Sequence, residues 1–123
     1  CSCMMFDDTL AQKIYASGDM FLMPSQSEPC GLAQMIALRY GTIPIVRETG
    51  GLRDSIHDAG DKSGNGFTFK SYNAHDMLDA VVRARAYYDD KMKWGRLVNT
   101  ALKQDFSWTK SAKDYIALYN DIH

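Results

Sequence analysis

The sequence has few cysteines, no long apolar run and no secretory leader. Only three of its 123 residues are cysteine, an odd and sparse count that argues against a disulfide framework. No apolar stretch approaches the roughly 20 residues that a transmembrane helix needs. No basic, apolar segment with a small-residue cleavage site begins the chain. We therefore expect a protein without a membrane partner, located in the cytoplasm.

An excess of positive charge is also missing. The chain carries 14 basic and 15 acidic residues, which gives a formal net charge of -1. Proteins that bind nucleic acid electrostatically have a basic excess, so we expect no nucleic-acid partner. The hydrophobic share of 46% supports a packed core.

Cys1 and Cys3 form a closely spaced pair, which raises the question of a metal site. A zinc site needs about four nitrogen or sulfur ligands, and no histidine lies at ligand spacing from this pair. We therefore expect no metal and interpret both cysteines as small strand residues. Their segment, CSCMMF, resembles a buried strand without a polar lead, so we expect the chain to be the C-terminal part of a longer protein.

Short apolar runs alternate with helical patterns along the chain. Apart from CSCMMF, strands are expected at residues 20–23, 43–46 and 66–69, and helices at 8–17, 31–40, 73–88, 91–102 and after Ser107. The run at 20–23 is typical of a fully buried strand. The alternation predicts an α/β fold with a Rossmann-like parallel sheet and flanking helices. We expect one domain, with a parallel α/β core at 1–72 and a helical tail at 73–123.

Two successive strand-to-helix loops carry the residues of chemical interest, PSQSEPCGL and RETGGL. Both are expected at the carboxyl edge of the sheet, where ligands bind. Pro29 keeps Glu28 extended, and Gly31 lets a ligand approach the backbone. The amides that begin the next helix favour a phosphate. A carboxylate beside a phosphate suits a sugar nucleotide, because it can accept hydroxyl hydrogen bonds or stabilise an oxocarbenium-like charge.

Simpler interpretations stay open at these loops. Glu28 also fits an acid that is favourable at a helix N-terminus and otherwise idle, and the two adjacent glycines of RETGGL also fit a plain tight turn. Neither loop matches a P-loop or the spaced-glycine dinucleotide fingerprint. For the charged residues that flank the second loop we favour solvated or ion-paired roles over ligand contact: Arg47, Glu48 and Arg53. For the aromatic residues of the tail we favour core or interdomain packing over stacking on a glucan: Trp94, Trp108, Tyr115 and Tyr119.

The segment DMFLMPSQSEPCGLAQMIALRYGTIPIVRETGGLRDSI closely resembles the C-terminal domain of bacterial glycogen synthases and plant starch synthases. The similarity continues through GNGFTF, RARAYY, KWGRL, DFSW and SAKDYIALY, so it covers essentially the whole chain. The resemblance implies a partial C-terminal domain of the GT-B fold, in which two Rossmann-like domains enclose the active site. It also implies transfer of glucose from ADP-glucose to the non-reducing end of an α-1,4-glucan, with retention and without a metal or other cofactor.

The resemblance also implies roles for individual residues. Glu28 would be the catalytic glutamate that contacts the donor glucose. The donor sugar and distal phosphate would meet the backbone of Cys30, Gly31 and Leu32. The second loop would line the same cleft through Thr49, Gly50 and Gly51. Phe6 lies where relatives carry an aromatic residue that stacks on the adenine.

This chain departs from the family pattern at two places. Gln26 and Ser27 replace the Arg-Phe that usually precedes the glutamate, which puts local packing in doubt. Ile36 lies where many other retaining GT-B enzymes have a second glutamate, and glycogen synthases of the bacterial type also lack that glutamate. The N-terminal domain with its Lys-Thr-Gly-Gly-Leu loop, and the basic residues that neutralise the leaving phosphates, lie outside this sequence. We therefore expect no turnover by the chain alone.

The implied partners are ADP-glucose, an α-1,4-glucan and the N-terminal GT-B domain, and a plant source would imply a plastid. Two other functions stay open. One is a different retaining GT-B transferase that uses UDP-glucose or sucrose. The other is a non-catalytic module that binds a nucleotide or a glucan. Donor competition separates the first from the main hypothesis, and binding without transfer would identify the second.

Overall fold

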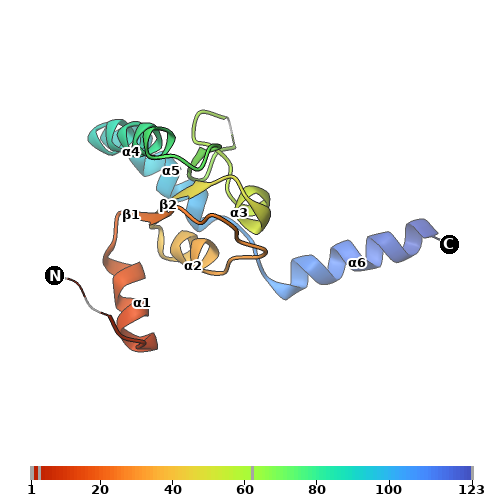
Figure 1. The fold of residues 1–123 in the computed structure, drawn as a ribbon. Helices are drawn as coiled ribbons and strands as arrows, with labels where there is room; N and C mark the ends of the chain where they lie inside the picture. Colours follow the sequence, from red (N-terminus) through yellow and green to blue (C-terminus); the bar gives the residue numbers. More distant parts are fainter. Residues whose placement is uncertain (1, 3, 62, 123) are drawn as a thin grey trace.

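The computed structural model describes residues 2, 4–61 and 63–122 (Figure 1). Within these residues the chain forms a three-stranded parallel sheet with six helices. The strands are β1 (Met20–Met23), β2 (Ile43–Arg47) and β3 (Phe67–Phe69), in the order β1-β2-β3. The helices are α1 (Asp8–Ser17), α2 (Ala33–Tyr40), α3 (Gly50–Ser55), α4 (Ala74–Asp89), α5 (Lys91–Leu102) and α6 (Trp108–Ile122).

The strand register explains how a proline fits into the central strand. Met20 of β1 pairs with Ile43 of β2, whereas pairing between β2 and β3 begins one residue after Pro44, at Ile45 and Phe67. Pro44 has no N–H to donate, and the residue before it donates its N–H toward the β1 side, to Asp19 O, at 3.0 Å. Because all three strands run in parallel, their carboxyl ends meet at one edge, as predicted.

Helices cover both sides of the sheet. In the view of Figure 1, α4 lies above the strands and α2 below them. α5 contacts α2, α4 and β2, so it closes the core between the two layers. The buried apolar core joins the strands to α2, α3, α4 and α5 through Leu38, Ile43, Ile45, Val46, Leu52, Ile56, Phe67, Phe69, Ala80, Ala84, Leu97 and Ala101.

The helical segment 73–123 therefore has two parts. α4 and α5 belong to the core, whereas no residue of α6 is buried and the helix extends away from the sheet (Figure 1). The interpretation of the tail aromatics as core is wrong for Trp108, Tyr115 and Tyr119, which are 89%, 60% and 61% exposed. It is confirmed for Trp94, which packs against the core. Interdomain packing stays a prediction for the α6 aromatics.

Two predictions about strands are wrong. Residues 2 and 4–7 form no regular structure, so the described part of CSCMMF is not a strand; Cys1 and Cys3 lie outside the described residues. β1 is also not fully buried, since Leu22 is 44% exposed. The reason is that, among the described strands, β1 pairs with β2 alone and forms an edge of the sheet.

Candidate active site

The loop after β1 and the loop after β2 are in direct contact. The backbone N–H of Gly51 donates to the carbonyl oxygens of both Glu28 and Pro29, at 3.1 Å each. A Cβ on Gly51 would lie 1.8 Å from Cys30 O, and a Cβ on Gly50 would lie 2.0 Å from Glu28 O. No side chain fits at either distance. Close packing of the two loops therefore accounts for both glycines, and Gly50 also has a left-handed φ of 44°, as in a tight turn.

Gly31 is required for a different reason. Its φ of 69° lies in the left-handed region, where residues with a Cβ are strained. A Cβ here would also come within 2.6 Å of the Gln34 side chain. The chain therefore turns sharply at Gly31 and brings the start of α2 to the edge of the sheet, beside Glu28.

The starts of α2 and α3 have no side-chain cap. Leu32 occupies the N-cap position of α2, and Thr49 that of α3, and neither side chain accepts a hydrogen bond from the helix. By contrast, α4 is capped by Asn73, whose Oδ1 accepts from Asp76 N at 2.9 Å. The first-turn amides of α2 thus remain without a side-chain acceptor at the end of the helix that carries partial positive charge.

A buried glutamine of α2 links the two loops through hydrogen bonds. Gln34 is fully buried, and its Nε2 donates to Gly31 O at 2.8 Å and to Ser55 Oγ at 3.1 Å. Ser55 Oγ in turn donates to Gly51 O at 2.6 Å. These bonds connect α2 to α3 and fix the position of the two loops relative to each other. Sequence reasoning missed this connection, because nothing in the local pattern marks Gln34 as buried.

The predicted site residues lie close together at this edge, with one exception. Glu28 is half-buried, and its carboxylate has no ion-pair partner among the described residues. Cys30 and Leu32 are exposed beside it. Phe6 is 92% exposed and lines a hollow of about 190 Å³ whose other residues come from α1 and the segment before it, not from either loop. The functional roles given to these residues stay predictions.

A larger hollow of about 520 Å³ borders the start of α2. It is lined by Leu32, Met35, Ile36 and Arg39 of this region and by residues 104–107 between α5 and α6. Neither Glu28 nor any residue of the second loop lines it. Of the residues in the two glycine loops, Leu32 alone lines this hollow.

Two of the three charged residues that flank the second loop have structural partners. Glu48 Oε1 accepts a hydrogen bond from Thr68 Oγ1 at 2.8 Å, and Arg47 donates to three backbone carbonyls of neighbouring loops. Arg53 is exposed. The expectation of ion-paired or solvated roles thus holds for Arg53 but misses the backbone contacts of Arg47.

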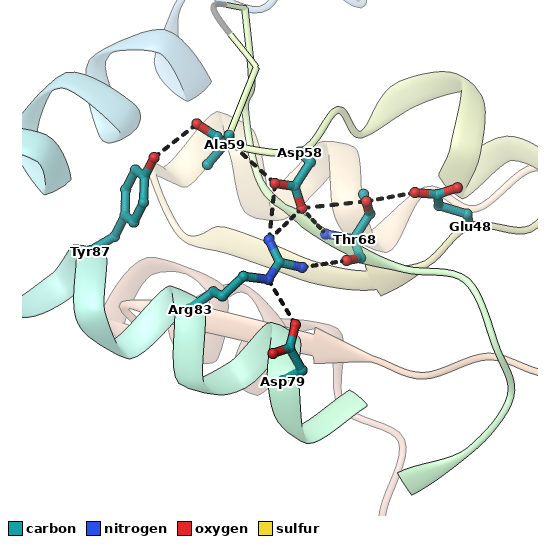
Figure 2. A network of polar contacts seen from close by, with 8 residues as sticks. Glu48, Asp58, Ala59, Thr68, Asp79, Arg83 and Tyr87 are labelled. Atoms are coloured by element: carbon teal, nitrogen blue, oxygen red, sulfur yellow. Dashed lines mark hydrogen bonds and ion pairs between the residues drawn. The ribbon is translucent and has the colours of Figure 1, made fainter. Parts of the chain in front are cut away.

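Figure 2 shows a second polar cluster, which fastens α4 to β3. Arg83 Nη1 donates to both carboxylate oxygens of Asp58, at 2.9 and 2.8 Å, while Nη2 donates to Thr68 O at 2.7 Å and Nε donates to Asp79 at 3.0 Å. Burial by itself would raise the pKa of Asp58, but the hydrogen bonds from Arg83 and from the Thr68 N–H outweigh it, so the pKa lies below its usual value. We interpret this cluster as structural.

Among the described residues, no group of three or more His, Cys, Asp or Glu side chains could hold a metal ion. Within the same residues, no helix is long and apolar enough to cross a membrane.

Comparison with protein families gives a match over most of the chain. The model described as "Glycosyl transferases group 1" matches residues 6–96. This chain belongs to the group 1 glycosyltransferases. Within the family, the chain is similar to the glycogen synthase of Anoxybacillus flavithermus, with 54% identity over 119 residues, and to that of Clostridioides difficile, with 56% identity over 119 residues. These alignments cover 95% of this chain and 25% of each relative, so the chain spans about a quarter of their length.

A solved structure extends the similarity to the fold of this glycosyltransferase chain. The catalytic domain of starch synthase IV from Arabidopsis thaliana, bound to ADP and acarbose, matches with a TM-score of 0.84 and 46% identity. The match covers 95% of this chain and 25% of the other. The predicted fold class, a Rossmann-like partial C-terminal domain of the GT-B type, is confirmed.

Proposed function

We propose that this chain is the donor-binding part of a glycogen or starch synthase. The whole enzyme would transfer glucose from ADP-glucose to the non-reducing end of an α-1,4-glucan, with retention of anomeric configuration. The observation that carries the proposal is the junction of the two loops, where Gly51 binds the backbone of Glu28 and Pro29 beside the uncapped start of α2. The similarity to glycogen synthases and to a starch synthase bound to ADP and acarbose supports the choice of substrates.

The donor diphosphate would bind at the start of α2. Amides without a side-chain acceptor, at the positive end of a helix, attract a phosphate. Cys30, Gly31 and Leu32 would contact the donor sugar and phosphate from this side, and the second loop would line the cleft through Thr49, Gly50 and Gly51. Phe6 would stack on the adenine once the remaining part of the enzyme completes the site.

Glu28 would act on the glucosyl group itself. Departure of the diphosphate leaves positive charge on the sugar ring, and a nearby carboxylate lowers the energy of that charge. In a front-face retaining transfer, the acceptor hydroxyl enters from the side on which the diphosphate leaves. The proposal assigns no metal or cofactor, because the α2 amides and basic residues supplied by the rest of the enzyme would neutralise the phosphates. A glucan-synthesising enzyme of this kind would act in the cytoplasm, or in a plastid of a plant.

A chimera tests this proposal. In it, this chain replaces the aligned segment of the Anoxybacillus flavithermus glycogen synthase, which supplies the other three quarters of the relative's length. We expect glucan extension from ADP-glucose in preference to UDP-glucose, and none from the isolated 123-residue chain. Glu28→Gln should lower kcat by at least about 100-fold, the scale of losing one electrostatic contact in the transition state.

The matched control is Asp89→Asn, which removes a carboxylate from an exposed ion pair on α4 and should leave kcat unchanged. Near-normal turnover by the Glu28→Gln chimera would remove this residue from the mechanism. Preference for UDP-glucose would indicate a different GT-B transferase. Binding of ADP without any transfer by the unmutated chimera would indicate a non-catalytic module.

A further inference from the structure

Arg47, the last residue of β2, lies between two loops that come from different strands. Its Nε donates to Ser25 O at 3.0 Å, and its Nη2 donates to Gln26 O. Its Nη1 donates to Lys70 O, in the segment after β3, at 3.3 Å. The guanidinium thus satisfies three backbone carbonyls, two of them in the loop that carries Glu28.

An aromatic ring limits where this guanidinium can move. Arg47 Cζ lies 5.7 Å from the centre of the Tyr72 ring, within cation–π distance. Arg47 itself is half-buried. A planar group with five donors in a fixed arrangement matches three carbonyls that come from different directions. The three N–H groups of a lysine ammonium are on a single nitrogen atom, so lysine cannot reach all three carbonyls.

Arg47 is one of two anchors on the same loop. The other is the Gly51 N–H, which binds Glu28 O and Pro29 O at 3.1 Å. Arg47 binds the loop before Glu28, and Gly51 binds it at Glu28 and just after. Arg47 ends β2 and Gly51 lies in the first turn of α3, so the segment from 47 to 51 holds the Glu28 backbone from both sides.

We propose that Arg47 is a positioning residue for Glu28, which rests on the catalytic role proposed above for that glutamate. Without the guanidinium, the carbonyls of Ser25 and Gln26 lose their partner, and the hydrogen bonds from Gly51 remain as the anchor of this loop within the described part of the chain. The carboxylate then samples positions away from the charge that develops on the sugar. A displacement of about 1 Å at a reacting group can cost on the order of 100-fold in rate.

The first test measures kcat and KM for ADP-glucose in the chimera with Arg47→Met and Arg47→Lys. We expect Arg47→Met to lower kcat by about 10- to 100-fold and to change KM much less. Arg47→Lys should recover part of the loss, because an ammonium can still donate to one or two of the carbonyls. Arg85→Met is the matched control, since Arg85 forms an exposed ion pair on α4, and its kcat should equal that of the unmutated chimera.

The second test separates positioning from a general loss of structure. Arg47→Met is combined with Glu28→Gln, and kcat is compared in the two backgrounds. If Arg47 acts through the Glu28 carboxylate, Arg47→Met has little further effect once that carboxylate is gone, because residues acting as a unit are not additive. A full effect of Arg47→Met in both backgrounds, or a rise in KM with unchanged kcat, overturns the proposal.

The two proposals fail in different ways. No glucan extension from ADP-glucose by the unmutated chimera contradicts the proposed function. Normal activity of Glu28→Gln contradicts the catalytic role of that glutamate and, with it, the role of Arg47. Loss of activity in Glu28→Gln together with an additive Arg47→Met contradicts only the positioning role. If Arg47→Met lowers the Tm so far that the chimera does not fold, the same cycle is run with Arg47→Lys, and the same outcomes decide.

Discussion

Three strand-to-helix connections leave the same edge of this sheet, and they are built in two ways. The connection after β3 caps its own helix locally: Asn73 caps α4, and Ser71 N donates to Asp76 Oδ2 at 3.2 Å. The connections after β1 and β2 instead bind each other through Gly51 and start helices that have no side-chain cap. In the first kind, a residue next to the helix caps its start, whereas the second kind joins two loops about 20 positions apart in the sequence.

The capped start of α4 contributes to stability, whereas the uncapped starts of α2 and α3 suit ligand binding at the same edge of the sheet. A capped helix start contributes about 1 kcal/mol of stability, and α2 and α3 forgo this contribution. At α2, the first-turn amides that a cap would bind are left without a side-chain acceptor, whereas at α3 the Gly51 amide binds the loop of Glu28. Stability is supplied elsewhere, by the loop–loop hydrogen bonds and by the buried Gln34 behind them. Such an arrangement suits a site that must bind an anion.

Separating the two glycine loops should have the largest effect. In Gly51→Ala the new Cβ would meet Cys30 O at 1.8 Å, so one backbone must move. We expect a loss of about 3 kcal/mol or more in the free energy of unfolding and loss of transferase activity. Thermal unfolding and kcat of the chimera measure both.

The control for this prediction is Gly95→Ala. Gly95 lies inside α5, and nothing lies within 4 Å of the Cβ that alanine would add. Alanine in a helix interior is favoured over glycine by about 0.5–1 kcal/mol, so this variant should be slightly more stable and fully active. If Gly51→Ala behaved like Gly95→Ala, the close contact between the loops would be wrong.

Giving α2 a negative charge at its start should change binding more than stability. Leu32 is 67% exposed, so Leu32→Asp removes little buried area. A carboxylate here interacts favourably with the helix dipole by about 0.3–1 kcal/mol but competes with the phosphates for the same amides. We expect an unchanged or slightly raised Tm and an affinity for ADP lowered by about tenfold, which is about 1.4 kcal/mol, measured by calorimetry on the chimera.

The opposite substitution at the capped connection is the matched control. Asn73→Ala removes the α4 cap and should cost about 1 kcal/mol of stability with no change in ADP affinity. If Leu32→Asp bound ADP as tightly as the unmutated chimera, the start of α2 would not be the phosphate site.

The smallest effect is expected where α4 is fastened to β3. Asp58→Asn removes the ion pair with Arg83 and should cost about 1 kcal/mol at neutral pH, since both side chains are partly exposed. The folded-state pKa of Asp58 is lowered. Its stabilising contribution is therefore complete above the unfolded value, near 3.8, and is lost as the pH falls through the folded pKa.

The free energy of unfolding is measured for the unmutated chimera and for its Asp58→Asn variant as the pH is lowered, and the difference between the two is followed. Three other aspartates with lowered pKa, Asp76, Asp90 and Asp105, are present in both proteins, so their contributions cancel. We expect the difference to narrow below about pH 4. A difference that is constant with pH would mean that the Asp58 charge contributes nothing.

Local patterns in the sequence predicted most of the elements correctly. The expected helix at 91–102 has the bounds of α5, Asp7 and Ser107 lie at the predicted N-termini of α1 and α6, and Gly41 ends α2 in a left-handed conformation. Caps, turns and periodicity depend on residues close in sequence. The sequence also predicted that the two loops lie next to each other, because parallel strands place their carboxyl ends at one edge.

The side-chain contacts that could not be predicted from the sequence join residues that are far apart in the chain. Arg47 meets Ser25 and Lys70, and Arg83 meets Asp58, over separations of more than 20 residues. An arginine at the end of a strand has no local pattern that distinguishes a backbone anchor from a solvated charge. The prediction that the α6 aromatics belong to the core is wrong because helical spacing places aromatic residues on one face of a helix. It does not show which surface that face contacts.

The most direct test of the central claim is a crystal structure of the chimera with ADP. The uncapped start of α2 should receive the diphosphate, with an oxygen of the distal phosphate about 3 Å from an amide nitrogen of the first turn of α2 and the Glu28 carboxylate facing the adjacent sugar position. A diphosphate bound instead at the capped start of α4, or anywhere else away from the two glycine loops, would contradict the account.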